Sequence, residues 1–125
     1  MSSPNCSCGP MKYNMVFSCS GAADVGAIAD QTARRLSQEK IASMCCAAAI
    51  AAEIPEILDM TSNAERLLVI DGCPKDCAKI IMEKAGFTKI KHLQLEMIGM
   101  KKKESPLTEE RIEAALNKAR LTILA

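Results

Sequence analysis

LLVIDGCPKDC, at residues 67–77, is the most informative stretch of this 125-residue sequence. Its apolar start, residues 67–70, is typical of a short strand that is buried on both faces. The pattern that follows the glycine predicts a turn and then a helix over residues 74–85, with proline in the first helical turn. A buried strand that leads directly into a helix is a building unit of parallel sheets covered by helices. The stretch therefore predicts an α/β fold.

Strand and helix patterns alternate along the rest of the chain in the same way. The expected strands cover residues 13–18, 41–46, 67–70 and 89–95. The expected helices cover residues 25–36, 47–60 with an interruption at Pro55, 74–85 and 108–119. This order predicts a small three-layer α/β sandwich with a mostly parallel four-stranded sheet. Residues 1–10 are expected to form a flexible cysteine-containing tail, before a single domain at residues 11–125.

The composition excludes several classes of partner. Hydrophobic residues make up 49% of the chain and charged residues 25%, as in ordinary soluble domains. A formal net charge of +1 supplies no long-range field, so neither nucleic acid nor an anionic membrane is expected as a partner. The sequence contains no membrane-spanning apolar run, and its first residues do not resemble a secretion signal. We therefore expect a cytoplasmic protein.

The seven cysteines are the most distinctive chemical feature of the chain. In a reducing cytosol, thiols serve metal binding or redox chemistry rather than structural disulfides. Cysteines follow three of the predicted strands, and parallel strands all end at one edge of their sheet. They are Cys19 after the first strand, Cys45 and Cys46 after the second, and Cys73 and Cys77 after the third. Four thiolates that converge at this edge would suit a structural zinc ion, and they would also suit an iron–sulfur cluster.

The residues around the third strand favour ionised thiols. A helix that begins at Pro74 would place Cys73 at its N-cap and Cys77 one turn further along. Both sulfurs would then lie near the positive end of the helix dipole, which favours the thiolate. Two nearby polar residues are expected to have structural roles. Asp71 is expected to accept hydrogen bonds from turn amides, and His92 is expected to be a satisfied or half-exposed strand residue rather than a metal ligand.

Two catalytic motifs that contain a cysteine after a strand do not match this chain. The phosphate-binding loop of low-molecular-weight tyrosine phosphatases needs an arginine six residues after its cysteine, and Val25 occupies that position. A thioredoxin-like pair has two residues between its cysteines, whereas three residues separate Cys73 from Cys77. Direct thiolate chemistry, such as redox or sulfur transfer, is the alternative to metal binding. The sequence leaves open whether the chain is an enzyme.

Four short motifs occur together across most of the chain. They are Cys19-Ser20-Gly21, Met44-x-Cys46, Asp71-Gly72-Cys73-x-x-x-Cys77-Ala78 and Ile98-Gly99. This set resembles the DGC-domain family, named for its Asp-Gly-Cys motif and described as zinc-binding proteins of unknown function. The resemblance implies zinc held by four chelating cysteines, which fall on Cys19, Cys46, Cys73 and Cys77. It does not name a reaction, and protein partners stay unknown.

Two questions about the cysteines stay open at this point. Cys45 is an alternative to its neighbour Cys46 as a ligand, because the motif contains only one cysteine there. The Cys6-Ser7-Cys8 segment lies outside the shared motifs, and the pattern does not say whether it contributes to the site.

Overall fold

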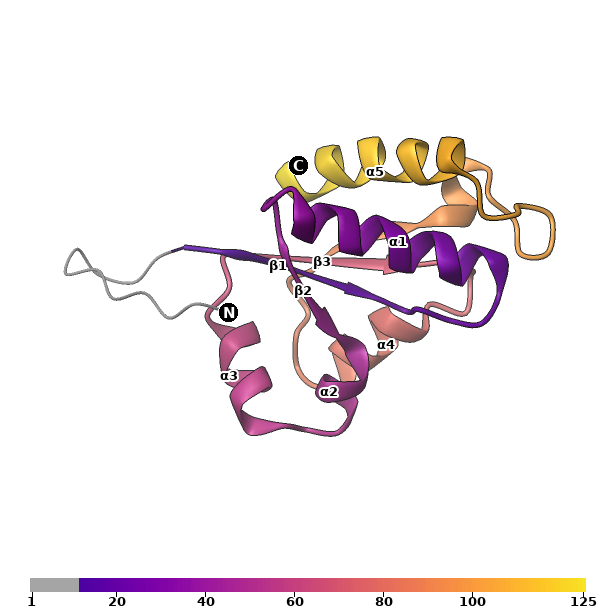
Figure 1. Cartoon of the computed structure of the whole chain (residues 1–125). Helices are drawn as coiled ribbons and strands as arrows, with labels where there is room; N and C mark the ends of the chain where they lie inside the picture. Colours follow the sequence, from indigo (N-terminus) through magenta and orange to yellow (C-terminus); the bar gives the residue numbers. More distant parts are fainter. Residues whose placement is uncertain (1–11) are drawn as a thin grey trace.

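The computed structural model describes residues 12–125 and is organised around one parallel sheet (Figure 1). The strands are β1 (Asn14–Ser18), β2 (Ser43–Cys46), β3 (Arg66–Asp71) and β4 (Lys91–Gln94). They lie in the order β2-β1-β3-β4, and every neighbouring pair is parallel. The expected tail at residues 1–10, with Cys6 and Cys8, lies outside the described residues.

Helices cover both faces of this sheet. They are α1 (Asp24–Gln38), α2 (Ala47–Ala51), α3 (Pro55–Ser62), α4 (Cys77–Lys84) and α5 (Glu109–Leu124), with a short 3₁₀ helix η1 (Leu95–Ile98) after β4. Helices α1 and α5 pack together on one face, while α2, α3 and α4 lie on the other (Figure 1). The predicted α/β three-layer sandwich with a four-stranded parallel sheet is therefore confirmed.

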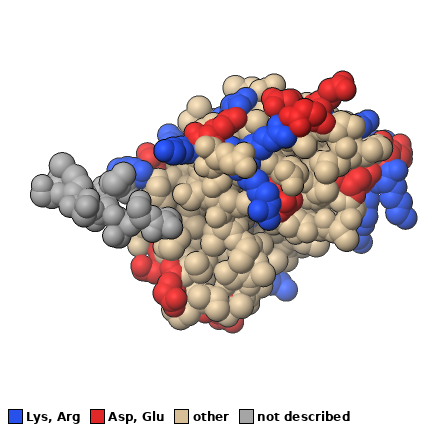
Figure 2. All heavy atoms as spheres, viewed as in Figure 1, with Lys and Arg blue, Asp and Glu red and all other residues tan. Residues whose placement is uncertain are grey.

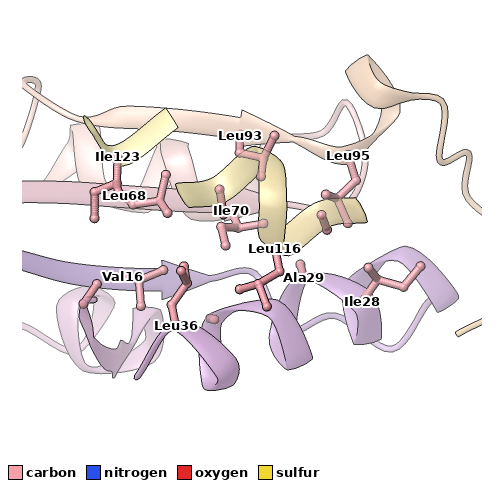
Figure 3. Packing of buried hydrophobic residues seen from close by; sticks show 14 of the residues in the cluster. Val16, Ile28, Ala29, Leu36, Leu68, Ile70, Leu93, Leu95, Leu116 and Ile123 are labelled. Atoms are coloured by element: carbon pink, nitrogen blue, oxygen red, sulfur yellow. The ribbon is translucent and has the colours of Figure 1, made fainter. Parts of the chain in front are cut away.

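The strands alternate their side chains between two hydrophobic clusters. Val16 of β1 and Leu68 of β3 face α1 and α5, as Figure 3 shows for their cluster. Phe17 and Val69, the next residue in each strand, contribute to the cluster under α2, α3 and α4. This alternation follows from the pleat of a strand. Burying each large aliphatic or aromatic side chain contributes about 1.5–3 kcal/mol, so both layers stabilise the sheet whose end forms the site.

The last helix confirms several local predictions. The side chain of Thr108 accepts a hydrogen bond from the Arg111 amide at 3.2 Å, so it caps α5 as its position suggests. The predicted buried stripe is present and extends further than expected. It consists of Ile112, Ala115, Leu116, Ala119 and also Ile123. The final apolar residues, which the pattern did not place, therefore continue the helix.

Charged side chains of both signs gather over α1 and α5, and fewer lie over β2 and α2 in the same view (Figure 2). Two ion-pair groups join the helices: Arg35 of α1 contacts Glu109 and Glu113 of α5, and Arg120 of α5 contacts Glu39 after α1. Exposed pairs of this kind add little stability each. None of the helices in residues 12–125 has the length and apolar character needed to cross a membrane.

Candidate functional site

The loops after β1 and β3 meet at the carboxyl edge of the sheet. The Cys19 amide donates to the Ile70 carbonyl at 3.0 Å, which extends the β1–β3 ladder by one residue beyond Ser18. The Gly72 amide then donates to Sγ of Cys19 at 3.4 Å. The first predicted ligand is thus in direct contact with the loop that carries Cys73, as the parallel topology predicts.

A cavity of about 530 Å³ lies beside these loops. Its lining includes Cys19, Cys73 and Cys77, together with the first turn of α1 and Lys102 and Lys103 from the loop before α5. Three of the four cysteines predicted as ligands therefore share one cavity. The strand order and the positions of the cysteines together predicted that these thiols would lie near one another at the carboxyl edge of the sheet.

Glycine is required where the cysteine loop approaches α1. A Cβ atom at Gly72 would lie 2.7 Å from the carbonyl carbon of Val25, and one at Gly26 would lie 2.4 Å from the carbonyl oxygen of Gly21. Both distances are far shorter than ordinary van der Waals contacts, and both involve backbone that cannot turn aside. The glycine of the Asp-Gly-Cys motif therefore allows the loop after β3 to lie directly against the helix that follows Cys19.

The start of α4 differs from the sequence prediction. The helix begins at Cys77 rather than at Pro74, and its N-cap Asp76 has a left-handed backbone with φ of 52°. Cys73 is therefore not the N-cap; it lies in a preceding turn, where its carbonyl accepts the Asp76 amide at 3.2 Å. Of the two thiols, Cys77 alone occupies the positive end of the helix dipole.

Asp71 explains why the helix begins where it does. Its carboxylate accepts the amides of Ala78 at 2.9 Å and Lys79 at 3.0 Å, which satisfies free N–H groups of the first turn of α4. The side chain is only 1% exposed, so it is a buried acceptor at the end of β3. The expectation that Asp71 accepts turn amides is confirmed. The sequence predicted the start of α4 at Pro74 instead of Cys77 because the capping side chain, Asp71, belongs to the end of β3 and not to the residue before the helix.

His92 and Gln94 of β4 also reach this loop, and the sequence analysis missed their connection to it. His92 Nε2 lies 2.9 Å from Asp71 Oδ2 and 3.7 Å from Asp76 Oδ1, and Gln94 Nε2 donates to Asp76 Oδ1 at 2.7 Å. His92 is therefore hydrogen-bonded, as one of the two expectations for it had it, and its side chain is 20% exposed. These contacts could have been predicted from the pairing of β4 with β3, which places Gln94 beside Asp71.

The carboxylates of Asp71 and Asp76 and the imidazole of His92 could also hold a cation. Their ligand atoms lie within 4.8 Å of one another. Among the described residues, no three of the thiols meet that same distance. Tetrahedral Zn–S bonds of about 2.3 Å place sulfur atoms about 3.8 Å apart. Metal binding by the thiols would therefore draw the cysteine loops closer together than they lie here.

Cys45 and Cys46 end β2 at the same edge of the sheet but outside this cavity. Cys46 pairs with Ser18 in the ladder and is exposed, while Cys45 pairs with Phe17 and packs against the cluster under α2 and α4. Burial raises the pKa of the Cys45 thiol. Cys46 lines a separate hollow beside Arg34 of α1, and Cys45 also contributes to the lining of that hollow. The fourth predicted ligand is thus a neighbour of the cavity and not one of its lining residues.

Burial also governs the ionisation of Cys19. Loss of solvent raises the pKa of its thiol, and the negative charges of Asp71 and Cys73 act in the same direction. The amides of Gly21 and Gly72 oppose this effect through hydrogen bonds. The net effect is that the pKa of the Cys19 thiol is raised above its ordinary value. A metal that binds there would displace its proton.

Asp24 anchors the lysine-rich loop at the cavity. Its carboxylate accepts the amides of Val25 at 2.8 Å, Lys103 at 3.0 Å and Ser105 at 3.0 Å. These hydrogen bonds, the one from Lys103 first, lower the pKa of Asp24. The loop is thereby fastened to the first turn of α1, which places Lys102 and Lys103 in the cavity lining.

The fold and the cavity define a small α/β protein with three cysteines gathered at the carboxyl edge of its sheet. The model of the DGC domain family matches residues 15–119, so the chain belongs to this family and the resemblance is confirmed. A curated relative is the "Anaerobic and virulence modulator AnvM" of Pseudomonas aeruginosa PAO1. It is 30% identical over 89 residues, which are 71% of this chain and 68% of the relative. No solved structure matches this chain.

Proposed function

We propose that this chain is a zinc-binding protein whose metal is held by cysteine thiolates at the carboxyl edge of the sheet. The proposed ligands are Cys19, Cys73 and Cys77, with Cys46 as the fourth. The observation that carries the proposal is the shared cavity of the first three thiols, which come from two separate strand ends. Membership of the DGC family supports it.

The chemistry of the surroundings fits such a centre. Four thiolates around Zn²⁺ carry a net negative charge, which nearby positive groups would offset. The cavity lining supplies Lys75, Lys102 and Lys103, and the first residue of α4 is itself the ligand Cys77. The two carboxylates in the lining, Asp24 and Asp71, are engaged by backbone amides and do not compete for the lysines. Bound zinc would supply a link that joins three loops distant in sequence.

Metal analysis combined with thiol labelling tests this proposal. Protein purified without oxygen should contain about one zinc per chain, and Cys73 should react slowly with iodoacetamide near neutral pH. A chelator that removes the metal should make the same labelling fast, because a closed four-coordinate site shields its sulfurs. Metal-free protein with all seven thiols freely reactive would contradict the proposal.

A second candidate function is direct thiolate chemistry, such as redox or sulfur transfer. The observation that favours it is the cavity itself, which provides room for a small molecule beside three thiols while Cys46 lies outside. Fast labelling of one cysteine in the metal-loaded protein would support this candidate over a closed zinc site. An iron–sulfur centre would instead give a coloured protein with visible absorption.

We propose a sensory or structural role for the zinc rather than a catalytic one. A site closed by four thiolates has no open position for water or substrate. The relative from Pseudomonas aeruginosa is named as a modulator, which is compatible with a sensory role. The labelling experiment above distinguishes this role from direct thiolate chemistry, in which the chain would act as an enzyme or a carrier.

A further inference from the structure

The loop that carries Cys73 and Cys77 is bounded by two aspartates that have different tasks. Asp71 ends β3 and caps α4 through the amides of Ala78 and Lys79. Asp76 precedes Cys77 and holds a left-handed backbone conformation, which is uncommon for residues other than glycine. Asp71 thus holds the start of the helix that carries Cys77, and Asp76 lies between the two cysteines in the chain.

Strand β4 contacts both aspartates through two residues on one face. His92 Nε2 lies 2.9 Å from Asp71 Oδ2, and Gln94 Nε2 donates to Asp76 Oδ1 at 2.7 Å. Leu93, which lies between them, packs in the opposite cluster with α5. Side chains two apart on a strand share a face, so the β3–β4 register delivers both donors to the cysteine loop together.

The contact of His92 is important because its partner, the carboxylate of Asp71, is buried. Asp71 is 1% exposed; its Oδ1 accepts the Ala78 amide and its Oδ2 accepts the Lys79 amide, and His92 adds a side-chain contact to the same Oδ2. A hydrogen bond to a buried charged group is stronger than a neutral one, and removing the donor leaves the acceptor less satisfied. The contact of Gln94 with Asp76 holds the second boundary of the loop.

From these contacts we infer that His92 and Gln94 are positioning residues for the metal site, acting through Asp71 and Asp76 on Cys73 and Cys77. The inference rests on the proposed function, since it concerns ligands of that site. Outer partners that orient metal ligands change metal affinity about 10–100-fold when they are replaced. Neither residue has a sulfur atom, and neither belongs to the motif that contains the cysteines.

Zinc affinity, measured by competition with a chromophoric chelator, is the first test. His92→Ala should weaken zinc binding by about 10–100-fold. His92→Gln, which keeps an N–H donor, should restore most of the affinity. Gln94→Ala should weaken binding about tenfold, and Gln94→Glu should weaken it further because it places a like charge beside Asp76. Met97→Ala, at a side chain 81% exposed in η1, is the matched control and should leave affinity unchanged.

Two further measurements separate positioning from a general loss of fold. The cobalt-loaded His92→Ala protein should show altered thiolate-to-metal absorption bands, since the loop geometry has changed. In the metal-free protein, the amides of Ala78 and Lys79 should exchange hydrogen faster in His92→Ala than in the wild type. If His92→Ala does not fold, the zinc affinity and the cobalt spectrum of Gln94→Ala test the inference, because Gln94 holds Asp76.

Three outcomes would decide against the inference. Wild-type affinity, cobalt spectrum and exchange in both His92→Ala and Gln94→Ala would overturn it. Loss of a second metal equivalent in His92→Ala would also overturn it, because His92 would then be a ligand together with Asp71 and Asp76. A wild-type protein that binds no zinc would contradict the proposed function. The positioning inference would then be judged from the metal-free variants alone, and unchanged amide exchange in them would refute it.

Discussion

Two of the three cysteine-bearing junctions at the carboxyl edge, those after β3 and β2, are built very differently. After β3, Asp71, Asp76, His92 and Gln94 connect the loop of Cys73 and Cys77 to α4 and β4. After β2, the chain passes directly into α2, and Cys46 at the N-cap makes no side-chain cap hydrogen bond. Topology brings both junctions to the same edge, but polar side chains organise only the first. From this comparison we expect the β3 junction to determine the geometry of the proposed site, and the β2 junction to adjust to it.

Removing Asp71 should break the organised junction most severely. Asp71→Ala deletes a buried acceptor of two amides and one imidazole, and we expect the free energy of unfolding to fall by roughly 3 kcal/mol. Urea unfolding of the metal-free protein measures this change. Asp59→Ala, at an exposed aspartate on α3, is the control and should stay within about 0.5 kcal/mol of wild type. A loss below about 1 kcal/mol for Asp71→Ala would show that the junction does not need this cap.

The close approach between the β3 loop and α1 should be nearly as sensitive. Gly72→Ala would place Cβ within 2.7 Å of the Val25 backbone, and the strain of separating the two segments should lower stability by about 2 kcal/mol. Gly21→Ala is the matched control, because a Cβ there meets nothing within 4 Å. Thermal unfolding of both variants makes the comparison. Equal melting temperatures would mean that the contact is loose in solution.

The β2 junction can be tested through its adjacent cysteines. Cys46→Ser should weaken zinc binding by about tenfold or more, equivalent to about 1.4 kcal/mol, while Cys45→Ser should keep the metal. The reason is that strand alternation directs Cys45 toward the cluster under α2 and α4. Chelator competition measures both variants. The reverse result would show that the ligand at this junction is Cys45.

The smallest expected effect concerns the lysine loop and its dependence on pH. The pKa of Asp24 is lowered in the folded protein, so its stabilising contacts are present above the ordinary value of 3.8. They are lost as the pH falls through the lower folded value. The melting temperature of the wild type should therefore exceed that of Asp24→Ala at pH 6, and the difference should shrink toward pH 2. A difference that is constant over this range would contradict the role of the charged carboxylate.

Much of the fold could be predicted because apolar periodicity and local signals agree. The continuous run at residues 67–70 indicated a buried strand, and it lies at the centre of β3. Pro55 begins α3 as a residue suited to the first helical turn, and Gly86 follows α4 with a φ of 95°. These features depend on neighbours within a few residues, so the sequence contains all the information that they need.

The sequence by itself placed the cysteines of three strand ends at one edge of the sheet, because parallel strands all end at the same edge. Only the tertiary structure decided how they meet. The start of α4 depends on Asp71, whose amide partners lie seven and eight residues away, and Asp71 also contacts His92, 21 residues away. Cys46 is the last residue of the edge strand β2, and the direction in which its side chain points decides whether it lines the cavity. Such contacts have no local sequence signal, since they arise from the register of strands and the close approach of helices.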